Sequence, residues 1–324
     1  MDQDVISIFG GAARRRELGI EHFANPAAVA KVVAEPQRGI PAIARDRALS
    51  NTVESNLAGI PTTHTLMLGD ARKLDELPDE SVHLVVTSPP YWTLKEYEPN
   101  DGQLGHVSDY DEFNRALACV WEHCYRLLVP GGRLVINVGD VSLPRRKVGR
   151  HLTFPLHASI IEHCRSLGFD NLSPIIWNKI ANAKYEAGGG SILGKPYEPN
   201  GIVKNDIEWI LFQRKPGGYR SPEAATRAMS VIPSHRHQEW FKSVWTFGGA
   251  STRQHPAPYP EELPSRLIRM FSFVGDVVLD PFSGTGTTSV AASRWGRDSI
   301  GIEVEPKYHQ MALSRLLNIT QRLI

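Results

Sequence analysis

The segment Thr87-Ser88-Pro89-Pro90-Tyr91-Trp92 has residue types that could hold a planar ring bearing an amino group. Two consecutive prolines cannot donate to a sheet ladder or continue a helix, so the chain must leave the apolar run 82–86 as a stiff loop. Hydroxyl and carbonyl oxygens in such a loop accept hydrogen bonds from an amino group, and the Tyr91 ring can stack on the ring of the ligand. An ordinary turn with a buried tyrosine is the alternative, and a second motif far downstream argues against it.

That second motif is Asp280-Pro281-Phe282-Ser283-Gly284-Thr285-Gly286-Thr287, after a strand predicted at 276–280. Glycines between a strand and a helix let backbone N–H groups approach a ligand closely. The motif is neither GxGxxG nor a P-loop, because no lysine follows the last glycine, so dinucleotides and triphosphates are disfavoured as ligands. The next predicted strand, 299–302, ends at Glu303, where a carboxylate can accept hydrogen bonds from ribose hydroxyls.

These residues describe a pocket for a nucleoside that carries a charged, amino-acid-like tail, as S-adenosylmethionine does. We expect Asp280 to hold the cationic end of the tail, and Gly284 and Gly286 to give backbone contacts. Glu303 is expected to bind the ribose, and a merely buried or capping carboxylate is its alternative.

The elements that must position both motifs alternate between strand and helix. A short helical turn is also expected around Leu74 and Leu77. This alternation predicts a doubly wound α/β sheet. Apolar runs predict strands at 65–68, 82–86, 134–138, 174–177, 206–213, 276–280 and 299–302, and helical spacing predicts helices at 110–128, 154–167 and 289–295.

Composition restricts the class of protein. The 324 residues include 36 basic and 35 acidic side chains and are 41% hydrophobic, so a nucleic-acid partner would have to meet a local basic patch. No apolar stretch approaches the roughly 20 residues that span a bilayer, and no signal pattern is present, so we expect a cytoplasmic protein that does not bind membranes. Cys119, Cys124 and Cys164 lack metal-ligand spacing, so core thiols and no metal are expected.

At this point the sequence resembles the amino-methylating DNA methyltransferases, which methylate cytosine N4 or adenine N6. The segments 87–92 and 280–287 match the catalytic and cofactor motifs of that family, and the similarity covers roughly residues 62 to 320. The catalytic loop precedes the cofactor loop, which resembles the family's beta arrangement, a circularly permuted Rossmann-like sheet. Gly69-Asp70-Ala71 and His255-Pro256-Ala257-Pro258-Tyr259-Pro260 are also similar, which implies that Asp70 approaches the adenine of the cofactor and that His255 and Pro256 lie near its methionine part.

Four parts of the chain are expected, of which the first is not explained by the resemblance. Residues 1–60 are an N-terminal extension, either a mobile solvated arm or an arm that contacts DNA or a second subunit. Residues 61–213 are the catalytic half and 255–324 the cofactor-binding half of the methyltransferase domain. Residues 214–254 are expected to be a basic, irregular target-recognition insert, for which a solvated connecting loop is the alternative. The Gly- and Lys-containing stretch 182–205 could add base contacts.

The implied reaction is direct methyl transfer to an exocyclic amine of a base rotated out of double-stranded DNA. The Ser88 side chain and the Pro89 carbonyl would accept hydrogen bonds from the amine, with Pro90 stiffening the loop and Tyr91, aided by Trp92, stacking on the base. No cysteine follows a proline, which argues against methylation of cytosine C5. No metal is needed.

Hydrogen bonding around Ser88 does not separate cytosine from adenine, since both bases present an amine beside a ring-nitrogen acceptor. Serine at the first motif position resembles the cytosine-N4 members, so that specificity is expected, with adenine N6 as the alternative. An RNA or protein methyltransferase and a catalytically silent DNA-binding subunit are weaker alternatives. A cognate restriction endonuclease and a homodimer are the further partners considered.

Overall fold

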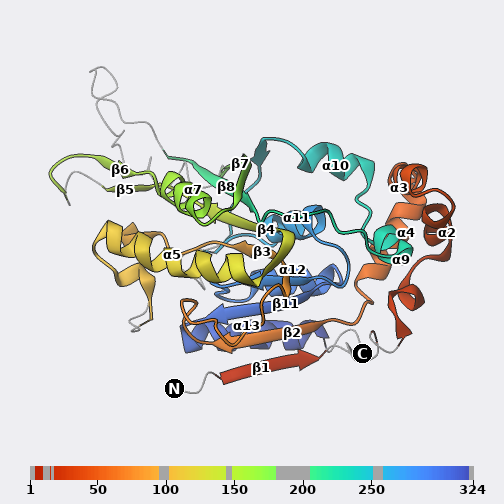
Figure 1. Cartoon of the computed structure of the whole chain (residues 1–324), viewed down its shortest axis with the longest axis horizontal. Coiled ribbons are helices and arrows are strands. Elements are labelled where there is room, and N and C mark those ends of the chain that lie inside the picture. Colours follow the sequence, from red (N-terminus) through yellow and green to blue (C-terminus); the bar gives the residue numbers. More distant parts are fainter. Residues whose placement is uncertain are drawn as a thin grey trace.

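A computed structural model describes residues 4–9, 15, 18–94, 102–143, 148–179, 205–250 and 258–320. Its centre is a nine-stranded sheet, and a separate two-stranded hairpin lies beside it (Figure 1). The sheet strands are β1 (Asp4–Phe9), β2 (Thr63–Leu68), β3 (Val82–Thr87), β4 (Leu128–Val138), β7 (Asp170–Asn178), β8 (Ile207–Arg214), β9 (Val244–Thr246), β10 (Val277–Asp280) and β11 (Asp298–Glu303), and the hairpin strands are β5 (Val141–Leu143) and β6 (Leu152–Phe154).

The strand order of the sheet is β1-β2-β11-β10-β3-β4-β8-β7-β9. The five strands from β2 to β4 in this order are parallel, whereas β1 and β8 are antiparallel to their neighbours. Although β10 and β11 come late in the chain, they lie between β2 and β3, so the predicted permuted α/β sheet is confirmed. The carboxyl ends of β10 and β3 meet where the winding reverses, which is where open α/β sheets bind ligands.

Helices cover both faces of the sheet. Val85 of β3 packs in the core beneath α5 and α7, whereas Leu84 and Val86 pack in the core beneath α11 and α12. Burial on both faces explains why β3 reads as a continuous apolar run. The helices are α2 (Pro26–Ala34), α3 (Pro36–Arg45), α4 (Arg47–Leu57), α5 (Tyr110–Leu127), α7 (Leu156–Ser166), α9 (Ala224–Met229), α10 (Ser234–Trp240), α11 (Glu262–Phe271), α12 (Thr287–Arg294) and α13 (Pro306–Thr320), with 3-10 turns at Ile20–Phe23, Trp92–Leu94 and Leu104–His106.

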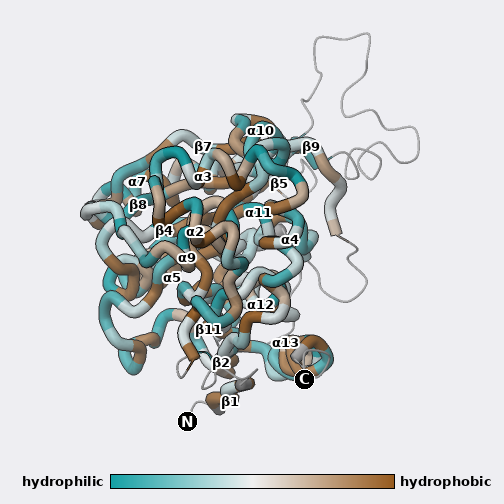
Figure 2. Tube along the Cα trace, turned by 90° about the vertical axis from the view of Figure 1, so that its right-hand side faces the viewer, coloured by the Kyte–Doolittle hydropathy of each residue, from teal (hydrophilic) through white to brown (hydrophobic). Residues whose placement is uncertain are grey.

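Most of the N-terminal extension is folded. Asn25 caps α2 by accepting the amides of Ala27 and Ala28, and Asp46 caps α4. The apolar faces of α2, α3 and α4 bury against α9 in a core of their own, at the end of the molecule opposite the β5–β6 hairpin (Figure 1). Figure 2 views this end and shows hydrophilic and hydrophobic segments alternating along the chain. The expected mobile solvated arm is therefore wrong for the described part, because its helices have a partner surface.

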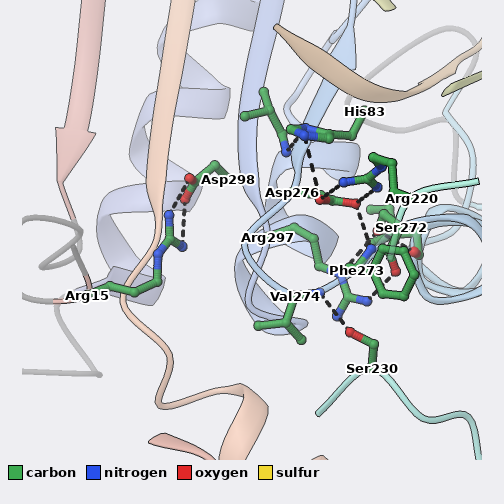
Figure 3. Close-up of polar contacts among 12 residues, drawn as sticks. Arg15, His83, Arg220, Ser230, Ser272, Phe273, Val274, Asp276, Arg297 and Asp298 are labelled. Atoms are coloured by element: carbon green, nitrogen blue, oxygen red, sulfur yellow. Dashed lines mark hydrogen bonds and ion pairs between the residues drawn. The ribbon is translucent and has the colours of Figure 1, made fainter. Parts of the chain in front are cut away.

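One arginine of the early basic cluster 14–16 is also internal. Arg15 is 9% exposed and donates from Nη1 to Asp298 Oδ1 at 3.0 Å and to the Pro61 carbonyl at 2.9 Å. Figure 3 shows this pair beside the start of β11. Arg15 therefore ties the extension to the sheet and is not available to contact DNA.

The expected irregular insert at 214–254 is also corrected. Its residues form α9, α10 and β9, and several of its cations are paired: Arg214 with Asp170, Lys215 with Glu80, Arg220 with Asp276 and Arg236 with Glu54. Arg214 pairs in register with Arg133 at the amino-terminal end of β4, so the basic part of this segment begins at the edge opposite the catalytic loop. Its charges hold elements together, which composition alone could not reveal.

Smaller differences concern turns and cysteines. The stretch that contains Leu74 and Leu77 forms turns and not a helical turn. Cys124 and Cys164 are buried thiols as expected, whereas Cys119 is exposed on α5. Within the described ranges, none of the helices combines the length and apolar character needed to cross a membrane.

Candidate active site

The two motif loops meet at the carboxyl ends of β3 and β10. Val278 and Leu279 of β10 pair with Leu84 and Val85 of β3, which brings the residues after both strands to one edge. Thr87 Oγ1 donates to Asp280 Oδ1 at 2.7 Å. The fold thus joins the catalytic and cofactor motifs directly.

Asp280 is fully buried and saturated with donors. Besides Thr87, its carboxylate accepts from the Phe282 amide at 3.1 Å, from Thr288 Oγ1 at 2.7 Å and from the Tyr259 hydroxyl at 2.8 Å. Burial raises its pKa above the ordinary value, although these hydrogen bonds act in the opposite direction. These contacts join β3, β10 and α12; Asp280 is not among the residues that line the cavity between the loops, and its role as the group that holds the cationic tail stays a prediction.

A cavity of about 60 Å³ lies between the loops. Its other walls include Gly102, Leu104 and Tyr308. Eight of the residues predicted for the site line it together: Asp70, Ser88, Pro89, Pro90, Pro281, Phe282, Gly284 and Glu303. Residues of the first motif and of the second, which are far apart in the sequence, therefore share the walls of one space.

Glu303 ends β11 at this cavity. Its Oε2 accepts the Gly284 amide at 2.7 Å, and its Oε1 accepts the Glu305 amide at 2.9 Å. Burial raises the pKa of the carboxyl to about 7, and the nearby Asp280 and Glu305 charges raise it as well. Glu303 therefore both shapes the cofactor loop and presents a carboxylate to the cavity.

Asp70 also lines the cavity, just after β2, the strand that pairs with β11. Arg72 binds its carboxylate through Nε at 3.0 Å and Nη2 at 2.6 Å, and the Arg72 amide also donates to it. Burial of Asp70 acts to raise its pKa, but the contacts with Arg72 outweigh burial and hold the pKa below its usual value. Asp70 is therefore an ionised acceptor at neutral pH.

The remaining residues of the cofactor loop are structural. Gly286 has φ +77°, and a Cβ there would lie 2.8 Å from the Ala312 Cβ, so this glycine permits close packing of α13. Ser283 donates its amide to the Ile302 carbonyl, and the Thr285 carbonyl accepts from Arg315. Ser283, Thr285 and Gly286 do not line the cavity.

The catalytic loop places its two aromatic residues differently. Tyr91 is 6% exposed, and its hydroxyl lies 3.4 Å from Ser88 Oγ. Trp92 is turned into an aromatic cluster, with ring centroids 5.2 Å from Tyr110 and 4.9 Å from Phe154. Trp92 is thus a core residue, which corrects the expectation that it helps Tyr91 stack on a base.

Three polar residues next to Tyr91 were missed in the sequence. Asn137 Nδ2 lies 3.4 Å from the Tyr91 hydroxyl and donates to Glu208 Oε2 at 2.6 Å, and Lys179 forms an ion pair with the other oxygen of Glu208. They come from the carboxyl end of β4, the end of β7 and the start of β8. Polar residues at the ends of apolar strands are the signal that could have found them.

Two predicted residues, His255 and Pro256, lie outside the described residues. Tyr259, from the same motif, is described and donates to Asp280, and burial raises its pKa well above the ordinary value. Residues 182–204 also lie outside. Their neighbours Lys179 and Asn205 are at the edge that carries the catalytic loop, where Asn205 Nδ2 donates to the Asp140 carbonyl at 3.1 Å.

The donor set of the cavity fits S-adenosylmethionine. Glu303 offers a carboxylate to ribose hydroxyls, Phe282 and Ile302 offer apolar walls to the adenine, and Asp70 offers an acceptor to its amino group. The cavity volume of about 60 Å³ is far below the roughly 300–1,000 Å³ of small-molecule sites, so the cavity must widen for a nucleoside to enter. In the described part of the chain no cluster of side chains could hold a metal ion.

Comparison of the sequence with known proteins agrees with this site. The pattern of the N6/N4 DNA methylase family matches residues 82–314. The type II methyltransferase M.MjaI of Methanocaldococcus jannaschii is 40% identical over 276 residues, which cover 76% of this chain and 88% of the relative. The DNA adenine methyltransferase YhdJ of Escherichia coli K12 is 30% identical over 269 residues, which cover 78% and 82%.

Solved structures show the same relationship. TTHA0409 of Thermus thermophilus, solved in complex with S-adenosyl-L-methionine, superposes with a TM-score of 0.66 at 51% identity, over 79% of this chain and 93% of that one. The cytosine-N4-specific PvuII DNA methyltransferase shares the fold, with a TM-score of 0.57 at 21% identity over 80% and 92% of the two chains. Because the family pattern spans both motif loops and the strands that carry them, the chain belongs to the N6/N4 DNA methylase family and is a DNA methyltransferase that uses S-adenosyl-L-methionine.

Proposed function

We propose that this methyltransferase is specific for cytosine N4 in double-stranded DNA. The observation that carries the proposal is Ser88: a hydroxyl, and not a carboxylate or an amide, stands where β3 ends, on the wall shared with Phe282 and Gly284. A serine at this motif position resembles the cytosine-N4 members of the family. Adenine N6 is the second candidate, because a relative at 30% identity is a DNA adenine methyltransferase.

The catalytic loop positions the target amine. Ser88 Oγ and the Pro89 carbonyl accept hydrogen bonds from this amine. These hydrogen bonds draw the nitrogen lone pair out of conjugation with the ring and direct it at the cofactor side of the cavity. Bound S-adenosylmethionine supplies an electrophilic methyl group there. Pro89 and Pro90 keep the acceptors in place because neither residue can change φ.

Tyr91 provides the face on which the base stacks after it leaves the duplex. Stacking on an aromatic ring contributes about 1–3 kcal/mol per base, which offsets part of the cost of unpairing. A Cβ on Gly139 would come within 3.3 Å of the Tyr91 ring and 3.4 Å of the Glu208 side chain, so Gly139 brings these two groups together. The base would therefore meet Glu208 and its partner Lys179 at the ring edge.

Lys179 supports cytosine as the base. Cytosine carries an acceptor, O2, beyond the amine and ring nitrogen, whereas adenine has a C–H group at that place. Lys179 is a donor held by Glu208 beside Tyr91, with only 12% of its side chain exposed. With cytosine the ammonium group donates to O2 as well as to Glu208, whereas the C–H group of adenine offers it no second acceptor.

The test is to incubate the purified protein with unmethylated DNA and S-adenosylmethionine and to identify the methylated nucleoside by mass spectrometry. N4-methylcytosine is the expected product. N6-methyladenine would overturn the base assignment and leave the family intact. Ser88→Ala serves as the matched inactive control, since it removes one oxygen from the cavity wall without changing the fold around it.

The partners of the enzyme follow from the same proposal. Methylation at a defined sequence protects that sequence from a cognate restriction endonuclease, so plasmids from cells that express the protein should resist cleavage at the mapped site. Sedimentation of the protein with and without duplex DNA tests the proposed homodimer. Residues 214–254 are the proposed target-recognition segment: they begin at the edge opposite the catalytic loop, and β9, which is parallel to β7, returns the chain to the edge that carries this loop.

A further inference from the structure

A second and much larger cavity, of about 840 Å³, lies at the amino-terminal edge of the parallel strands, between α3, α10 and the end of α11. Its volume falls within the roughly 300–1,000 Å³ of small-molecule sites. Arg133, on its wall, begins the stretch of β4 that ends at Val138 near the catalytic loop, about 17 Å away at the rise of a strand. This cavity is therefore separate from the active site.

The wall of this cavity is strongly basic. Among the residues that the structure describes, no aspartate or glutamate lines it. Arg220 and Arg269 have carboxylate partners behind the wall, Asp276 and Glu54 (Arg220 and Asp276 in Figure 3). The five arginines that line the cavity are Arg45, Arg133, Arg220, Arg227 and Arg269.

The other three arginines have no carboxylate partner in the part of the chain that the structure describes. Within the described ranges, Arg45, Arg133 and Arg227 form no ion pair and donate no side-chain hydrogen bond. The Nε atom of Arg133 is buried without a partner, and its guanidinium lies 5.1 Å from the ring centroid of Phe271. Burial lowers the pKa of Arg133, and the nearby Arg214 lowers it further. The surroundings of Arg133 therefore disfavour its positive charge.

We infer that this cavity binds a phosphate-bearing small molecule of the nucleoside polyphosphate class. A guanidinium group binds two phosphate oxygens through parallel N–H donors. The three guanidinium groups without a carboxylate partner in the described ranges therefore have a total charge that suits a polyphosphate group. Tyr219, which is 85% exposed at the rim, offers a ring face to a base, whereas Phe271 and Phe273 on the wall already have Arg133 and Arg220 over their rings. An anion there removes the repulsion among the arginines, so binding stabilises the fold.

The test is isothermal titration calorimetry of the full-length protein with ATP, in the presence of saturating S-adenosylhomocysteine so that the cofactor cavity is blocked. Tripolyphosphate and adenosine are titrated as separate probes. The variants are Arg227→Gln and Arg133→Met/Arg227→Gln. Arg165→Gln, an exposed arginine on α7 paired with Glu162, is the matched control.

We expect one ATP per chain, with the affinity lowered roughly tenfold or more in the double variant and unchanged in Arg165→Gln. Equal affinity for tripolyphosphate and ATP would assign the site to free polyphosphate, and tighter binding of ATP assigns it to a nucleotide. Absence of ATP binding at millimolar concentration, or equal binding by Arg227→Gln and the wild type, overturns the inference. Displacement of ATP by duplex DNA alone would show a DNA-phosphate contact and would also overturn it. Circular dichroism of each variant separates loss of the site from loss of the fold.

Discussion

Thr87 of β3 donates a 2.7 Å hydrogen bond to Asp280 of β10, although 193 residues separate them in the sequence. Both side chains are buried, and Asp280 accepts three further hydrogen bonds. The residue before the catalytic serine and the first residue of the cofactor motif are thus a single buried polar unit. The geometry of each loop depends on the other.

Thr87→Val tests this unit, since valine has nearly the shape of threonine and lacks the hydroxyl. We expect a loss of about 1–3 kcal/mol in the free energy of unfolding, because Asp280 stays buried with one donor fewer. Urea denaturation measures this loss, and Thr87→Ser, which keeps the donor, is the control. If Thr87→Val unfolds at the same urea concentration as Thr87→Ser, the hydrogen bond contributes no net stability.

Tyr91→Ala should slow methylation and leave cofactor binding nearly intact. The loss of stacking predicts a reduction of about 5- to 150-fold in kcat/KM for DNA. Calorimetric titration with S-adenosylhomocysteine should give a Kd close to that of the wild type. Tyr91→Phe, which keeps the ring and removes the hydroxyl that lies 3.4 Å from Ser88 Oγ and Asn137 Nδ2, is the matched control, and equal losses of methylation and cofactor binding would remove Tyr91 from its assigned role.

Glu303 predicts a pH dependence of cofactor binding. With a pKa near 7, the carboxyl gains a proton as the pH falls below that value and then loses part of its capacity to accept hydrogen bonds from ribose hydroxyls. The Kd for S-adenosylmethionine should therefore increase between pH 8 and pH 6. Glu303→Gln should bind weakly at all pH values, and a wild-type Kd that does not change with pH contradicts the assignment.

We also expect Glu303 to lower the free energy of unfolding at neutral and alkaline pH. The pKa of Glu303 is raised in the folded state above its ordinary 4.5, so the folded state binds the proton more tightly than the unfolded state does. Burial of the ionised carboxylate therefore lowers the free energy of unfolding, and this loss is absent below about pH 4.5. The loss grows as the pH rises and reaches its full value of about 3 kcal/mol above pH 7. Glutamine does not titrate, but it leaves one of the Gly284 and Glu305 amides without an acceptor, so the stability of Glu303→Gln relative to the wild type should increase from pH 4.5 to pH 8 in denaturation without cofactor. Glu162→Gln, at an exposed position, is the control.

Lys179→Met tests the proposed preference for cytosine. Without the ammonium group, cytosine loses a donor to its O2 atom and adenine loses nothing, so the preference for cytosine in kcat/KM should fall by about 5- to 30-fold. Single-turnover methylation of two duplexes that differ only in the target base measures the ratio. Lys73→Met, at a lysine away from Tyr91, is the control, and an unchanged ratio in Lys179→Met would exclude a specificity role.

The sequence predicted the sheet well because its central strands are buried on both faces. The run that becomes β3 is apolar without interruption, and Pro89 and Pro90 mark its end. The helix that becomes α5 was read from its period, and the structure adds the Asp109 cap at its start. The order of the two motifs also indicates the permuted arrangement through the resemblance to the family, but the order of the strands and the edge strands β1 and β9 come from the structure alone.

What could not be predicted depends on contacts between distant segments. Nothing local shows that Asp280 accepts hydrogen bonds from Thr87, Thr288 and Tyr259, so the part that this aspartate plays in joining the two loops could not be predicted. The basic segment after β8 reads as a nucleic-acid surface until Asp276 and Glu54 are found beside its arginines. The helices of the extension are short, and their apolar faces became recognisable only when α9 supplied the surface that they cover.

The insertion of β10 and β11 between β2 and β3 has a consequence for biosynthesis. During translation β3 is made 193 residues before Asp280, which is roughly 10 to 40 s at 5–20 residues per second. Throughout that interval the facing edges of β2 and β3 have no neighbour, since the strands that separate them do not yet exist. The nascent chain therefore carries two unpaired strand edges that invite aggregation, and chaperone binding during synthesis should concentrate there until β10 and β11 emerge.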